Sequence, residues 1–87
     1  MSEHYSLEAF RGIVKAIPEQ QTPVLHLVKV DGGYVLEHVS GARLKTFRGS
    51  LRVFSSADTA VNFVTENISR PLLRTIELRL VVAAGLF

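Results

Sequence analysis

Three glycine-bearing turns divide the middle of the chain into short segments. The turns are Asp31-Gly32-Gly33, Ser40-Gly41 and Arg48-Gly49-Ser50, at a spacing of eight to nine residues. The segments around them are rich in aliphatic and β-branched residues and have the length of strands: 24–30, 34–39, 42–47 and 51–54. Turns this close together make hairpins, and consecutive strands usually pair. The spacing therefore predicts a four-stranded antiparallel meander.

A helix is predicted before the meander. Ser6 is a suitable N-cap, and apolar residues recur behind it at the spacing of one helix face: Leu7, Phe10, Ile13, Val14 and Ile17. Glu8 favours the first turn and can pair with Arg11 one turn later. Pro18 ends the pattern, so we expect a helix of about 11 residues.

A second helix is predicted after the meander. Ser55 and Asp58 stand in the capping-box relation. The inward-facing residues expected on this helix are Ala57, Ala60, Val61, Val64 and Ile68. Pro71 is expected to stop the helix, with an exit loop over 67–71.

A last strand is predicted over 72–82. Apolar and polar residues alternate from Thr75 to Arg79, so that Ile76, Leu78 and Leu80 share a face. From Val81 to Phe87 every residue is apolar or glycine, which indicates a segment that is buried in its own sheet or paired with a second copy.

These elements give an α+β fold in the order α-β-β-β-β-α-β, with both helices packed on one face of the sheet. The 87 residues are expected to form a single domain, 1–87. Hydrophobic residues make up 47% of the sequence, a generous supply for so short a chain. We therefore expect a homodimer in which the surplus apolar surface is buried.

The candidate binding site is a cluster of positive charge on the third predicted hairpin. Arg43, Lys45, Arg48 and Arg52 fall within ten residues that contain no Asp or Glu, in a chain of net charge +2. A basic two-stranded ribbon can neutralise phosphates, and an exposed Phe47 can stack on a base. The alternative is that these charges only keep the sheet surface soluble.

Catalytic and metal-binding patterns are weak or missing in the sequence. It contains no cysteine, no nucleophile elbow, no phosphate loop and no HExxH pattern, so we expect no enzyme, no cofactor and no small-molecule substrate. His26 and His38 lie on neighbouring predicted strands and would face each other only across a three-residue turn. With His4 as a third candidate they remain too few for a convincing zinc site.

The first residues lack the basic and apolar regions of a signal peptide, and the longest apolar run, Leu80–Phe87, has eight residues. A span across a bilayer needs about 20. We therefore expect a cytoplasmic protein without a membrane partner.

The run from Leu44 to Ala60 combines a strand, an Arg-Gly turn, a basic strand ending in Phe and a Ser/Asp-capped helix. It resembles a pattern in small accessory proteins of bacterial conjugative plasmids and integrative elements. The resemblance covers about a fifth of the chain and implies a bacterial protein of a mobile element that acts near DNA. It brings no catalytic residues.

Two functions follow from the sequence. The first is a small non-catalytic protein that contacts nucleic-acid backbone through the four cations. The second is a protein-interaction or assembly module that uses the apolar C-terminal strand.

Overall fold

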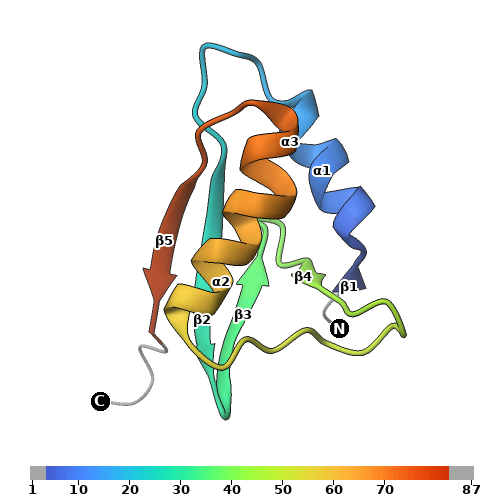
Figure 1. Ribbon diagram of the computed structural model, residues 1–87, viewed down its shortest axis with the longest axis vertical. Helices are drawn as coiled ribbons and strands as arrows, with labels where there is room; N and C mark the ends of the chain where they lie inside the picture. Colours follow the sequence, from blue (N-terminus) through green and yellow to red (C-terminus); the bar gives the residue numbers. More distant parts are fainter. Residues whose placement is uncertain (1–3, 83–87) are drawn as a thin grey trace.

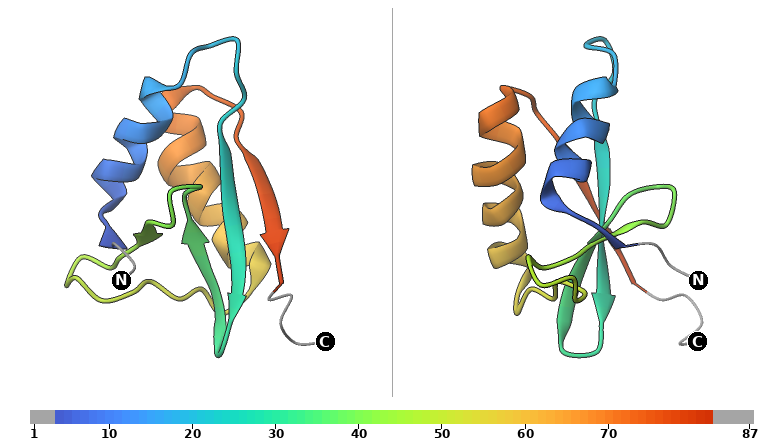
Figure 2. Two further views of the ribbon diagram at one scale, coloured as in Figure 1. Left: turned by 180° about the vertical axis from the view of Figure 1, so that it is seen from behind. Right: turned by 90° about the vertical axis from the view of Figure 1, so that its right-hand side faces the viewer.

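The computed structural model describes residues 4–82. In this part of the chain a five-stranded sheet carries helices on one face, which confirms the α+β class (Figures 1 and 2). The strands are β1 (His4–Tyr5), β2 (Val24–Val30), β3 (Gly33–Glu37), β4 (Arg43–Leu44) and β5 (Glu77–Val81), in the spatial order β1-β4-β3-β2-β5. The helical segments are α1 (Leu7–Ala16), α2 (Ala57–Val64), η1 (Thr65–Ser69) and α3 (Arg70–Leu72).

Helix α1 forms as its sequence predicts. The Ser6 side chain accepts a hydrogen bond from the Ala9 amide at 3.2 Å and so caps the first turn. Arg11 pairs with Glu8 at 2.7 Å on the solvent side, while Phe10 and Val14 are buried against the sheet. Pro18 lies just beyond the C-cap residue Ile17, where the backbone is already extended.

The sheet is mixed, and the expectation of a purely antiparallel meander is wrong. Strands β2, β3 and β4 are antiparallel neighbours, but β5 runs parallel to β2. The helical segments α2, η1 and α3 cross back over the sheet, so that β5 runs in the same direction as β2. Parallel neighbours require a long crossover of this kind. The short strand β1, which was not predicted, pairs in parallel with β4.

The third and fourth predicted strands are much shorter than expected. Only Arg43 and Leu44 form β4, and segment 51–54 contributes two isolated bridges, Lys45 with Leu51 and Tyr34 with Phe54. Because Leu51 pairs near β4 and Phe54 pairs at the start of β3, this segment crosses from one strand to another. It therefore forms no ladder of its own.

The second helix differs from the prediction at both ends. Its N-cap is Ser56, whose side chain accepts from the Thr59 amide at 3.1 Å, and not Ser55. The helix continues without a break through a π-helical stretch, η1, into α3, and Pro71 lies inside this continuous run. It ends only at Leu73, so the last strand begins at Glu77 and not at Leu72.

The core lies between the sheet and the helices. Its fully buried members are Phe10, Val14, Leu25, Leu27, Leu36, Leu44, Phe54, Ala60, Val64 and Ile68. Ile76 and Leu78 pack against this cluster as their alternation predicts, whereas Val61 of α2 is exposed. Residues 83–87 of the predicted apolar terminus lie outside the described residues.

Candidate functional site

The four cations of the predicted basic site are not gathered on one surface. Arg43 is engaged within the sheet, because its Nε lies 2.8 Å from Oε2 of Glu37 on the neighbouring strand. The side chains of this pair are only 28% and 22% exposed. Arg52 lies on the helix side, with its guanidinium 4.9 Å from the ring centre of Phe54 and 5.3 Å from that of Phe63.

The remaining two cations lie in the loop between β4 and α2, Lys45 just before the tight turn at its tip and Arg48 within that turn. The Thr46 amide donates to the Ser50 carbonyl at 2.6 Å, and the Gly49 amide to the Thr46 carbonyl at 2.9 Å, which closes a tight turn. Phe47 at this turn is fully exposed, and Arg48 beside it is exposed. Within the described residues neither Arg48 nor the half-buried Lys45 makes a side-chain ion pair.

The sheet face opposite the helices, the open face, carries a row with one residue from every strand. In register across the sheet stand His4, Arg43, Glu37, His26 and Arg79. The alternation of side chains along each strand can be read from the sequence, but the register between strands cannot. The row was therefore not predicted.

The row does not bring together His26, His38 and His4, the three histidines considered as zinc ligands. His26 stands opposite Glu37 and not His38, because the β2–β3 turn has two residues. His38 instead shares a 2.9 Å hydrogen bond with Ser40. His4 is three strands away from His26, about 14 Å at the usual strand spacing. Across residues 4–82 no three potential metal ligands come together.

The second candidate surface is the outer edge of β5. In the described part of the chain β5 pairs only with β2, so its other side forms an edge of the sheet (Figure 1). The Glu77 amide donates to the Pro23 carbonyl at 2.9 Å, toward β2. Since backbone groups alternate along a strand, the amides and carbonyls of Leu78 and Leu80 point outward.

Aliphatic side chains accompany this open edge. Leu80 is 60% exposed and Val82 is 53% exposed, and Val81 is exposed between them. Edge strands are normally short, charged, interrupted by proline or covered. At the other edge of the sheet β1 has only two residues, whereas β5 has five. The arrangement offers both backbone hydrogen bonds and apolar surface to another extended chain.

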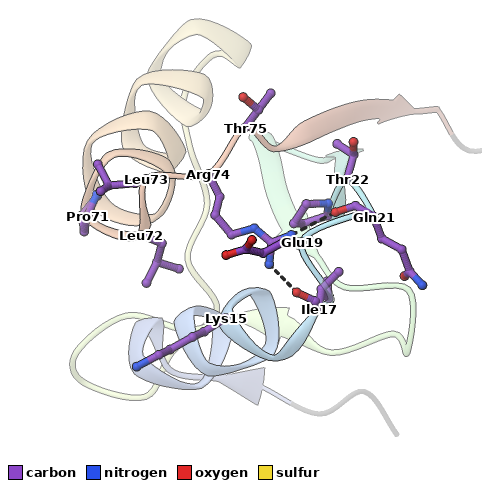
Figure 3. Close-up of a pocket in the computed structure, with 11 residues that line it drawn as sticks. Lys15, Ile17, Glu19, Gln21, Thr22, Pro71, Leu72, Leu73, Arg74 and Thr75 are labelled. Atoms are coloured by element: carbon purple, nitrogen blue, oxygen red, sulfur yellow. Dashed lines mark hydrogen bonds between the residues drawn. The ribbon is translucent and has the colours of Figure 1, made fainter.

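A groove of about 930 Å³ lies between the end of α1 and the segment after α3 (Figure 3). Arg74 crosses it and donates four hydrogen bonds to backbone carbonyls, those of Val14, Ile17, Pro18 and Gln21, at 2.5 to 3.0 Å. These contacts occupy the guanidinium and tie the end of α1 to the segment before β5. Arg74 therefore joins the two sides of the groove.

Comparison with protein-family models, with curated proteins and with solved structures finds no match for this chain. Among the described helices, none has the length and apolar character needed to cross a bilayer.

Proposed function

We propose that this protein is a non-catalytic assembly module that pairs, through the outer edge of β5, with an extended strand of a second chain. The observation that carries this proposal is the outward direction of the Leu78 and Leu80 backbone groups, beside the exposed side chains of Leu80 and Val82. Strand addition supplies main-chain hydrogen bonds, and the side chains at alternate positions supply selectivity. A second copy of the chain is the simplest partner, in line with the homodimer expected from composition.

The test is the mass of the full chain in solution. Sedimentation velocity over a range of concentrations should show a monomer–dimer equilibrium. Leu80→Lys should weaken dimerisation by at least about tenfold, because it places an ammonium group in the contact. Leu73→Lys is the matched control, since Leu73 is also an exposed leucine, 91% exposed, but lies outside β5. A monomer at every concentration, or equal effects of both substitutions, contradicts the proposal.

A second proposal is contact with nucleic-acid backbone, now centred on the turn at 46–50. The fully exposed Phe47 beside the exposed Arg48 favours it, because an aromatic ring and a cation together bind single strands by stacking and charge. Lys45 lies close by in the chain, while Arg43 pairs with Glu37 and Arg52 lies over the rings of Phe54 and Phe63. A cytoplasmic location in a bacterium, and a mobile element that acts near DNA, stay predictions attached to this reading.

Fluorescence anisotropy with a labelled single-stranded oligonucleotide tests the second proposal. Lys45→Ala with Arg48→Ala should weaken binding and lower the salt slope by about one to two. Phe47→Ala should cost about 1–3 kcal/mol of binding free energy. Arg70→Ala is the control, because Arg70 is exposed, bonds to Glu66 and lies on α3. Binding that does not change with salt, or that falls equally in the control, rules this proposal out.

A further inference from the structure

We infer that the strand which pairs with β5 is β5 of a second copy, antiparallel and centred on Leu78. This inference rests on the proposed function and specifies its partner and register. A two-fold axis perpendicular to the sheet relates identical strands as antiparallel neighbours. The two sheets then join into one, with the helices of both copies on the same face.

The direction of the backbone groups limits the possible registers. Outward-pointing residues must stand opposite outward-pointing residues, because only they can exchange hydrogen bonds across the edge. Glu77 donates toward β2, so the outward set in this region is Leu78, Leu80 and their neighbours of the same parity. A two-fold axis through any residue of β5 satisfies this condition, and the side chains must select among these registers.

Charge selects the register centred on Leu78. In it, Glu77 stands opposite the partner's Arg79, and Arg79 stands opposite the partner's Glu77. A centre at Glu77 sets two glutamates opposite each other, and a centre at Arg79 sets two arginines opposite each other. A centre at Leu80 sets Arg79 opposite the partner's Val81. Directly opposed unlike charges stabilise a strand pair, and like charges destabilise it.

The same register also places apolar residues opposite one another on the helix side. Leu78 stands opposite the partner's Leu78, and Leu80 stands opposite the partner's Ile76. In the single chain Ile76 and Leu78 pack against the core, whereas Leu80 is 60% exposed. Pairing in this register would therefore cover the most exposed aliphatic side chain within β5.

Within one chain Glu77 and Arg79 already bond to each other, Arg79 Nε to Glu77 Oε2. They share the open face of β5, two residues apart. The dimer would join two such pairs into a cluster of four alternating charges. Each carboxylate would then have a guanidinium on its own strand and another across the edge.

The test is a charge-exchange experiment with the full chain. Glu77→Arg and Arg79→Glu each place like charges opposite each other twice in the dimer. Each variant alone should dimerise at least about tenfold more weakly than the parent. Mixed in equal amounts they should form a heterodimer, because the first then presents two arginines to the two glutamates of the second. The chain with both exchanges should again form a homodimer.

Native mass spectrometry with one variant isotope-labelled distinguishes these species, and circular dichroism confirms that each variant is folded. Four results overturn the register while leaving strand pairing in place: variants that dimerise as well as the parent, a mixture without heterodimer, loss of dimer only on substitution of Arg79, or a double exchange that stays monomeric. A parent chain that is monomeric throughout overturns the proposed function itself.

Discussion

At the scale of single residues, the arginines of this protein differ in what their guanidinium groups contact. Arg74 donates to four carbonyls at the end of α1 and in the loop that follows, Arg43 pairs with Glu37, and Arg52 covers two phenyl rings. In the sequence alone these side chains are equivalent positive charges. Only Arg48 of the predicted cluster is left with its guanidinium in solvent and near an exposed ring.

Substitution of Arg74 tests its structural role. Arg74→Ala should lower the free energy of unfolding by about 2–4 kcal/mol, because it removes charged donors from four carbonyls, of which those of Val14 and Ile17 are partly shielded from water. Arg74→Lys should recover little of this stability, since the compact ammonium group of lysine cannot reach all four carbonyl oxygens that the planar guanidinium group of arginine bonds. Urea denaturation measures both.

The control for Arg74 is Arg70→Ala, which removes an exposed pair with Glu66. It should cost less than about 0.5 kcal/mol. Equal losses at the two positions would contradict the assignment of Arg74 as the residue that ties α1 to the segment before β5.

At the scale of elements, the helix that follows the antiparallel strands continues through a π-helical stretch and past Pro71, where the sequence predicted that it would stop. The turn at Thr65–Ser69 is wide, and Arg11 of α1 donates to the Asn67 carbonyl within it at 2.7 Å. Pro71 follows within the same continuous helix and provides no amide for the carbonyl of Asn67, four residues back, so the bond from Arg11 supplies that carbonyl with a donor. The helix ends instead at Leu73, which adopts a left-handed conformation with φ of 54°.

A leucine at this position carries strain that glycine would avoid. Leu73→Gly should raise the free energy of unfolding by about 0.5–1 kcal/mol, because the exposed side chain contributes little packing and the left-handed backbone favours glycine. Leu73→Ala keeps the strain and should leave stability nearly unchanged. Thermal or urea unfolding compares them, and a loss of stability in the glycine variant would show that the leucine side chain makes a contact of its own.

At the scale of the whole molecule, local signals predicted the helices and the first hairpin but not the order of the sheet. The stripe of α1, the Asp31-Gly32 turn and the alternation around Leu78 depend on neighbours in sequence, and the structure agrees with them. The parallel pairing of β5 with β2 joins residues about fifty positions apart, so no local pattern reports it. The row across the open face and the open edge of β5 both follow from that pairing.

The cluster of charges stays a prediction, and the fold adds a second candidate surface, the outer edge of β5. Arg43 and Arg52 fell within the predicted cluster because the sequence does not show that Glu37 and the rings of Phe54 and Phe63 would engage them. The apolar strand at the end of the chain was predicted as an alternative interaction surface. Its outward backbone direction depends on the bond from Glu77 to Pro23, which only the fold reveals.

Hydrogen exchange at the amides of β5 tests most directly whether its outer edge is paired in solution. The amides of Arg79 and Val81 point toward β2 and should be protected at every concentration, which makes them internal controls. The amides of Leu78 and Leu80 point outward, and we predict that they become protected as the concentration rises through the dimerisation range. Rapid exchange at Leu78 and Leu80 at all concentrations, with Arg79 and Val81 protected, would contradict assembly through this edge.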